Sequence, residues 1–120
     1  MELCKIPVIS ARFEEFNPPG KYHLIYSSHV IEHTKNPKEF MKKAFDLLED
    51  NGIFYLDTPD TYYQNSEEKR WHHFETRNPY EHCCLLGFVG IRMLASLAGF
   101  QTVRVERYDE FMSQQAILIK

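Results

Sequence analysis

The amino-acid sequence predicts an α/β domain, with a mostly parallel sheet, an antiparallel hairpin at the C-terminus and helices packed on the sheet. Apolar runs typical of strands alternate with segments of helical periodicity, which is the pattern of this fold class. The last two apolar runs are joined by a short polar link, which favours a hairpin. A chain of 120 residues with 43% hydrophobic residues has the length and composition of one domain, spanning residues 1–120.

Three segments precede the first predicted helix. Ile6–Ile9 is a short apolar run, and Pro7 restricts it to a short or edge strand because proline donates no ladder hydrogen bond. Asn17–Gly20 reads NPPG and predicts a turn. Tyr22–Ser28 is then expected to form a buried strand that runs into a polar loop.

The first helix has clear start and stop signals. Asn36 is an N-cap residue, Pro37 suits the first helical position, and Glu39 has the spacing of a capping box. Asp50–Gly52 is predicted to end the helix. One apolar face recurs at helical spacing and consists of Phe40, Met41, Ala44, Leu47 and Leu48.

The next strand and helix are separated by a long irregular stretch. Ile53–Leu56 is a predicted strand that Thr58–Asp60 ends. Thr61–His82 is polar, charged and aromatic without a regular period, and such a stretch is usually functional or mobile. Phe88–Ala98 is predicted as a helix with Gly99 as its left-handed cap. Its apolar face consists of Ile91, Leu94, Ala95 and Ala98.

Two predicted strands end the chain. Val103 and Val105 alternate with polar neighbours, which is the period of a half-buried strand. Ala116–Ile119 is a last apolar run close behind. The two strands are therefore expected to form the antiparallel hairpin.

Composition and charge argue against several classes of function. The net charge is −3, so the basic face that non-specific nucleic-acid binding requires is not expected. No apolar run approaches the ~20 residues of a membrane span, and the first residues show no signal-peptide pattern. The three cysteines include no CxxC pair, which predicts reduced thiols, a cytoplasmic protein and no structural zinc site.

Three segments resemble class I S-adenosylmethionine-dependent methyltransferases. Lys21–Pro37 reads KYHLIYSSHVIEHTKNP and resembles that family's fourth strand, the "EH" pair behind it and the proline that opens a helix. Leu47–Asp60 resembles the following segment, and Ala98–Phe100 resembles the turn before the sixth strand. The resemblance runs from about Ser10 onward. It implies a partial Rossmann-like sheet, methyl transfer to an acceptor and S-adenosylmethionine as the cofactor.

The N-terminal elements of that family are missing from the sequence. Members open with a strand and a glycine-rich GxGxG loop, and a second strand ends in an acidic residue that holds the cofactor ribose. The five glycines form no such pattern, and Ile6–Phe16 resembles the family's third strand and the loop behind it. The chain thus resembles a C-terminal half. Losing two charge-assisted hydrogen bonds of ~1.5–3 kcal/mol each weakens binding roughly 10²–10⁴-fold. We expect this chain alone to bind S-adenosylmethionine weakly or not at all and to be inactive.

The missing half also removes a neighbour from the fourth strand. Leu24–Tyr26 then lies at an open apolar edge, which pairs readily with another strand. We expect either that Ile6–Ile9 moves beside this edge or that a second copy or a partner chain associates there. The second outcome gives an alternative function, a non-catalytic methyltransferase-like remnant that acts as an interaction or oligomerisation module.

The resemblance also implies a set of cofactor-binding residues. Three follow the carboxyl end of a strand, where open α/β sheets bind ligands, and would face the methionine part of the cofactor. The other two resemble the loop that borders the adenine, although Phe13 could equally fill the core. The five candidates are Phe13, Glu14, Ser28, His29 and Val30.

The acceptor pocket is expected within Thr61–His82, where the family usually builds it. Aromatic side chains with polar tips suit ligand recognition, and they equally suit a loop folded onto the sheet. His73 or His82 is a candidate general base near neutral pH. The acceptor is expected to be a small molecule or a glycan. The pocket candidates are Tyr62, Tyr63, Trp71 and His72.

Glu32 and His33 repeat the family's "EH" pair. We interpret them as structural, with Glu32 bonding loop amides and His33 packing on the next helix. His29, Glu32 and His33 also fall at i, i+3 and i+4, so a helical turn would place them on one face. Imidazoles with a carboxylate suit a transition metal. That site is the lesser alternative, and the sequence prediction is that no metal binds.

Overall fold

A four-stranded sheet forms the centre of the structure, a computed structural model that describes residues 6–65 and 82–120. The strands lie in the order β1-β2-β4-β3. β1 and β2 pair in parallel, while β4 pairs antiparallel with both β2 and β3. The α/β class and the C-terminal hairpin are confirmed. The strand bounds are Tyr22–Ser28 for β1, Leu48–Pro59 for β2, Gln101–Tyr108 for β3 and Ser113–Ile119 for β4.

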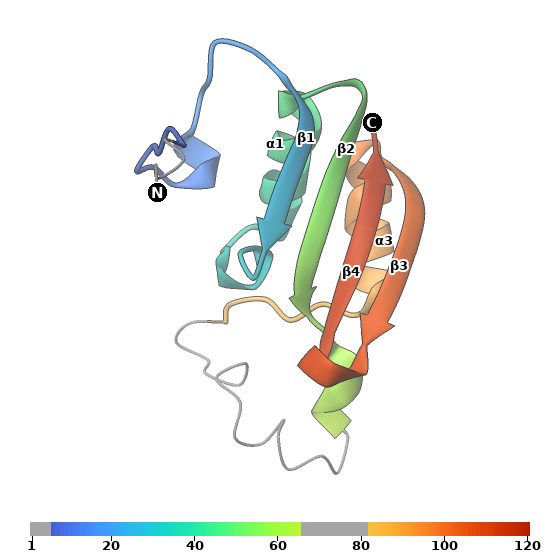
Figure 1. Cartoon of the computed structure of the whole chain (residues 1–120). Coiled ribbons are helices and arrows are strands. Elements are labelled where there is room, and N and C mark those ends of the chain that lie inside the picture. The colour runs from blue at the N-terminus through green and yellow to red at the C-terminus, as the bar shows by residue number, and fades with distance from the viewer. Residues whose placement is uncertain (1–5, 66–81) are drawn as a thin grey trace, which may run out of the picture.

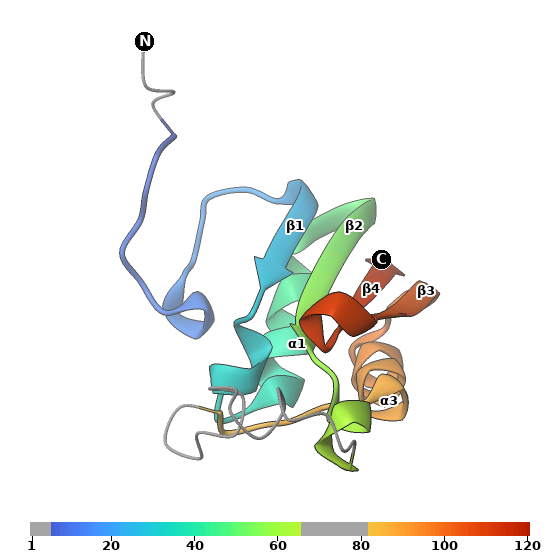
Figure 2. The same ribbon diagram turned by 60° about the horizontal axis from the view of Figure 1, so that its bottom comes forward.

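Two helices, α1 (Pro37–Leu47) and α3 (Phe88–Ala98), cover the same face of the sheet (Figure 1 and Figure 2). The core lies between these two layers, and each large apolar side chain buried there contributes about 1.5–3 kcal/mol. No described helix is long and apolar enough to cross a membrane. The core is built mainly from Phe40, Met41 and Ala44 of α1, Ile91 and Ala95 of α3, Phe54 and Leu56 of β2, and Ala116 and Leu118 of β4.

Two of the three predicted cap signals of the helices are confirmed. Asn36 Oδ1 accepts a hydrogen bond from the backbone N–H of Glu39 at 3.2 Å. Gly99 ends α3 with φ of +106°, and a Cβ at this position would lie 3.0 Å from the Phe45 ring. The C-terminal end of α1 was predicted three residues too late. The helix stops at Leu47 because the fully buried Leu48 already pairs with β1 as part of β2.

Two further sequence predictions about the strands are wrong. Val103 was expected on the half-buried side of its strand, but it is 55% exposed. The pairing of β3 with β4 shifts register between Thr102 and Arg104, and this irregularity places Val103 toward solvent. β1 was expected to be buried, but Leu24 is 59% exposed and Tyr26 is 66% exposed. Among the described strands, β1 has only β2 as a neighbour, so one edge of β1 is open.

The segment before β1 does not cover this edge. Ile6–Ile9 forms no strand, and its three large apolar side chains are all at least 66% exposed. The expectation that Ile6–Ile9 moves beside β1 is therefore wrong. Pro7 explains part of the outcome, since it cannot donate to a ladder. Pairing of Leu24–Tyr26 with a second copy or a partner chain stays a prediction.

Candidate cofactor and acceptor site

Polar groups join the carboxyl ends of β1 and β2. The Ser28 hydroxyl donates a hydrogen bond to Asp57 Oδ2 at 3.1 Å, and the backbone N–H of His29 donates to the Asp57 carbonyl at 2.9 Å. His29 has φ of +51°, in the left-handed region that side chains rarely adopt. The chain therefore turns sharply out of β1 and enters the short 3-10 helix η2 (Ile31–His33) at the edge where open α/β sheets bind ligands.

Two cavities open beside this turn, with volumes of about 600 and 400 Å³. Phe13 and Val30 line both cavities, Glu14 lines the larger one and Ser28 the smaller one. Four of the five cofactor candidates are thus brought together, whereas His29 lines neither cavity. Volumes of several hundred Å³ are typical of sites for small-molecule ligands.

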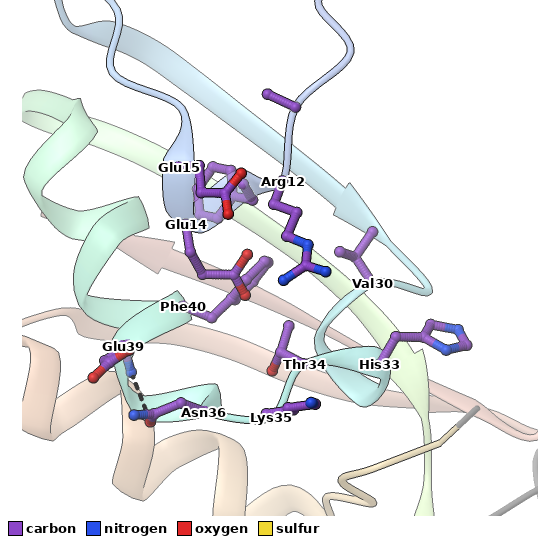
Figure 3. A pocket seen from close by; sticks show the side chains of 12 residues that line it. Arg12, Glu14, Glu15, Val30, His33, Thr34, Lys35, Asn36, Glu39 and Phe40 are labelled. Atoms are coloured by element: carbon purple, nitrogen blue, oxygen red, sulfur yellow. Dashed lines mark hydrogen bonds between the residues drawn. The ribbon is translucent and has the colours of Figure 1, made fainter. Parts of the chain in front are cut away.

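The larger cavity has an apolar floor and a charged rim. The rings of Phe13 and Phe40 pack with their centroids 4.8 Å apart, so Phe13 both faces the cavity and contacts the core. Figure 3 shows Arg12 and Glu14 pointing into the same space, opposite Thr34. Sequence reasoning missed Phe40 as a lining residue because its helical spacing indicates only a core position.

Glu32 lies behind the cavities and is 1% exposed. Its Oε2 accepts a hydrogen bond from the Thr58 hydroxyl at 3.0 Å, and its backbone carbonyl accepts one from the N–H of Cys84 at 3.0 Å. Oε1 lies 3.2 Å from Nδ1 of His29 and 4.0 Å from Nε2 of His33. The prediction that Glu32 bonds loop amides holds for its backbone carbonyl, which accepts from the N–H of Cys84, whereas its carboxylate binds a hydroxyl of the neighbouring strand.

His82 lies next to this carboxylate although fifty positions separate them in the sequence. The rings of His33 and His82 meet edge to face with centroids 4.7 Å apart, so His33 packs on His82. One ligand atom each from Glu32, His33 and His82 lies within 4.8 Å of the other two, and His29 is not part of this group. Of the two candidate general bases, His82 is thus near the carboxyl end of β1, while His73 lies outside the described residues.

Two of the four predicted pocket residues lie on the 3-10 helix η3 (Thr61–Asn65). Tyr62 is 61% exposed, and its ring stacks on the guanidinium of Arg107 at 3.8 Å from the ring centroid. Tyr63 is buried and donates a hydrogen bond to Asp109, and burial together with this bond raises the pKa of Tyr63 well above its ordinary value. Neither tyrosine lines the two cavities. Trp71 and His72 lie outside the described residues.

A polar network holds the chain where it leaves β2. Gln114 Nε2 donates to the carbonyls of Pro59 at 3.3 Å and Leu86 at 2.6 Å. Asp60 is fully buried and accepts a hydrogen bond from Nε of Arg107 at 2.6 Å. Asp60 and Leu86 also form an isolated parallel bridge. The chain therefore leaves the sheet and returns to it at one fixed point.

The parallel strand pair and the crossover through α1, with polar groups at the carboxyl ends of the strands, define a partial Rossmann-like fold. A family model described as a methyltransferase domain matches residues 4–105. The chain belongs to this methyltransferase domain family, as the three sequence segments predicted. None of the curated proteins matches the sequence significantly.

Solved structures of methyltransferases share the fold. A candidate O-methyltransferase from Nostoc punctiforme is 14% identical, with a TM-score of 0.74 over 93% of this chain and 36% of its own. Magnesium protoporphyrin IX methyltransferase from Synechocystis, solved with S-adenosylhomocysteine, is 15% identical, with a TM-score of 0.66 over 92% of this chain and 49% of its own. The N-methyltransferase NodS from Bradyrhizobium japonicum is 10% identical, with a TM-score of 0.61 over 93% of this chain and 53% of its own. This chain thus spans about a third to a half of their lengths.

Proposed function

We propose that this chain contributes to S-adenosylmethionine-dependent methyl transfer and forms one side of the cofactor site. The family match over residues 4–105 carries the proposal, and the two cavities at the carboxyl end of β1 support its location. Bound S-adenosylmethionine would supply a methyl group on a sulfonium, which passes directly to a nucleophile of the acceptor. The acceptor we propose is a small molecule or a glycan, in keeping with the acidic net charge of −3.

The residues around the cavities fit parts of the cofactor. Phe13, Phe40 and Val30 offer the apolar surface that a flat adenine requires. Glu14 offers a carboxylate on the rim of the same cavity, which suits the hydroxyl and amine donors of a nucleoside or an amino acid. In the metal-free chain, His82 would take a proton from an acceptor hydroxyl as general base, since it lies near the strand end.

Weak cofactor binding by this chain alone follows from the sequence. No GxGxG loop is present, so the backbone N–H groups and the ribose-binding carboxylate that such domains use are missing here. We therefore expect a dissociation constant in the millimolar range. Full activity would require the other wall of the site from a further segment or a partner chain, and the open edge of β1 is where we place that contact.

An NMR titration of the whole chain with S-adenosylhomocysteine tests the proposal. Amide signals of Phe13, Ser28 and Val30 should shift with a millimolar dissociation constant. Phe13→Ala should weaken binding about tenfold because it removes a stacking surface worth about 1.4 kcal/mol. Val103→Ala, at an exposed site on β3, serves as the control and should leave binding unchanged.

Two results would contradict this function. One is the absence of any shift at millimolar ligand, and the other is a shift that Phe13→Ala leaves unchanged. A dimer seen by light scattering in the same sample, together with no ligand shift, would favour the alternative of an oligomerisation module. The specific observation behind that alternative is the open edge that β1 has among the described strands, next to the exposed Leu24 and Tyr26 on the sheet face that the helices leave uncovered.

A further inference from the structure

Glu32 has a buried oxygen that no hydrogen bond satisfies. Its side chain is 1% exposed, and Oε2 is bonded to the Thr58 hydroxyl, but Oε1 has no hydrogen-bond partner. Nδ1 of His29 lies 3.2 Å from Oε1 without meeting the geometry of a hydrogen bond. A buried carboxylate oxygen without a partner is costly, so this atom indicates that the fold reserves it for a ligand.

Two imidazoles lie near the same carboxylate. Nε2 of His33 lies 4.0 Å from Oε1, and the ring of His82 meets the ring of His33 edge to face. The three side chains come from η2 and from the segment before α3, and one ligand atom of each lies within 4.8 Å of the others. We infer that Glu32, His33 and His82 form a binding site for a divalent transition-metal ion of the zinc class.

The donor set selects the class of metal. One carboxylate and two imidazoles are typical zinc ligands, and imidazole suits other late first-row metals as well. Magnesium and calcium prefer sites made of oxygen atoms alone, so this mixture disfavours them. Three protein ligands also leave a fourth tetrahedral position for water or another ligand.

Small side-chain movements close the site around an ion. Two ligand atoms that each lie about 2.1 Å from a tetrahedral ion are about 3.4 Å apart. The candidate ligand atoms lie within 4.8 Å of one another in the structure, so they would have to move closer together. The His33 side chain is 43% exposed, so its ring has room to rotate inward. The backbone needs no rearrangement, because the hydrogen bond from Cys84 N–H to the Glu32 carbonyl already holds the two segments together at 3.0 Å.

Such an ion would tie the segment before α3 to the turn behind β1. This inference goes beyond the proposed methyl transfer and does not depend on it, because metal binding is measured without any cofactor. The two proposals therefore fail separately. If the chain binds zinc but does not bind S-adenosylhomocysteine, only the proposed cofactor site is contradicted. If it binds S-adenosylhomocysteine but does not bind zinc, only the proposed metal site is contradicted.

Calorimetric titration of the EDTA-treated full chain with Zn²⁺ is the direct test. We expect one ion per chain, and we expect Co²⁺ in the same protein to give the intense visible absorption of a tetrahedral site. His82→Ala and Glu32→Gln should each weaken zinc binding by about a hundredfold or more, since each removes a ligand. His23→Ala should leave it unchanged, because His23 is exposed at the opposite end of β1.

Other outcomes would overturn the site. The metal site is contradicted if the titration with Zn²⁺ gives no heat. It is also contradicted if His82→Ala and Glu32→Gln both bind zinc with unchanged affinity. Cys83→Ser is the matched check for an accidental thiol site, because Cys83 is exposed and adjacent to His82. Loss of zinc binding in Cys83→Ser with full binding in His82→Ala contradicts the inference. Far-UV circular dichroism of each variant establishes that it is folded before the titration.

Discussion

Asp60 and Glu32 are both buried beside the carboxyl ends of the parallel strands, and their surroundings differ. Asp60 uses both oxygens, one for Nε of Arg107 at 2.6 Å and one for the backbone N–H of Tyr62 at 3.0 Å. Glu32 uses one oxygen for the Thr58 hydroxyl, while the other lies 3.2 Å from Nδ1 of His29 and 4.0 Å from Nε2 of His33. A full counter-charge lies against Asp60, whereas the partners given for the Glu32 carboxylate are a hydroxyl and imidazoles.

The comparison separates a structural carboxylate from a candidate ligand. The Arg107 guanidinium lies over the rings of Tyr62 and Phe88, 3.8 and 4.5 Å from their centroids, so the partner of Asp60 is itself fixed on both sides. The hydrogen bond that Arg107 donates to Asp60 also raises the pKa of Arg107, which keeps the pair charged. Burial alone thus does not identify a binding site, and the unused oxygen together with the neighbouring imidazoles is what makes Glu32 a candidate ligand.

Breaking the Asp60 pair should give the largest effect on stability. Arg107→Ala leaves a fully buried carboxylate without its counter-charge, so we expect a loss of about 3 kcal/mol in the free energy of unfolding. Urea denaturation measures this loss. Arg104→Ala is the matched control, because Arg104 is 60% exposed and its ion pair with Glu106 is worth under about 1 kcal/mol. Equal losses in the two variants would refute the structural role of Asp60.

Tyr63 should give a smaller effect with a distinctive pH dependence. Its folded-state pKa is raised above the ordinary value of 10.0 by burial and by Asp109, so its contribution is present below pH 10.0 and is lost as the pH rises beyond it. Tyr63→Phe should cost about 1 kcal/mol near neutral pH and should flatten the decline of stability above pH 10.0. Unfolding curves measured at several pH values across this range test the prediction. If stability falls with pH equally steeply in Tyr63→Phe and in the unchanged protein, the pH dependence does not come from Tyr63.

Glu32→Gln should give the smallest effect when metal is absent. The amide oxygen can still accept the Thr58 hydrogen bond, and the substitution removes a buried charge that has no fixed counter-ion. We expect a change below about 1 kcal/mol in the metal-free protein, measured by urea denaturation in EDTA. A loss as large as that of Arg107→Ala would show that Glu32, like Asp60, is mainly structural.

Local signals predicted the elements better than their contacts. The limits of α3 and the left-handed Gly99 follow from spacing and a single residue, and both are confirmed. The end of α1 was misjudged because Leu48 fits the helical apolar face equally well. Only its pairing with Tyr22 shows that it belongs to a strand. Val103 was misplaced for a similar reason, since a register shift against β4 has no sequence pattern of its own.

The candidate sites were predicted in part. Ser28 and Val30 lie at the cavities because they stand at the carboxyl end of β1, which a motif can indicate, whereas Phe13 and Glu14 reach the cavities from the 3-10 helix η1 (Phe13–Glu15). The grouping of His82 with Glu32 depends on a contact between distant segments. The hydrogen bond from Cys84 to Glu32 brings them together, and no local spacing encodes it.

The bonds of Gln114 to Pro59 and Leu86 bear on how such a domain changes over time. They fix to the sheet both ends of the stretch of chain between Pro59 and Leu86. Doubling the length of a loop with fixed ends costs only about 0.6 kcal/mol. Insertions and replacements there are thus cheap, and a descendant can acquire a new acceptor preference while its scaffold stays intact. By bonding to Pro59 and Leu86, Gln114 marks the two positions between which the sequence can change most easily.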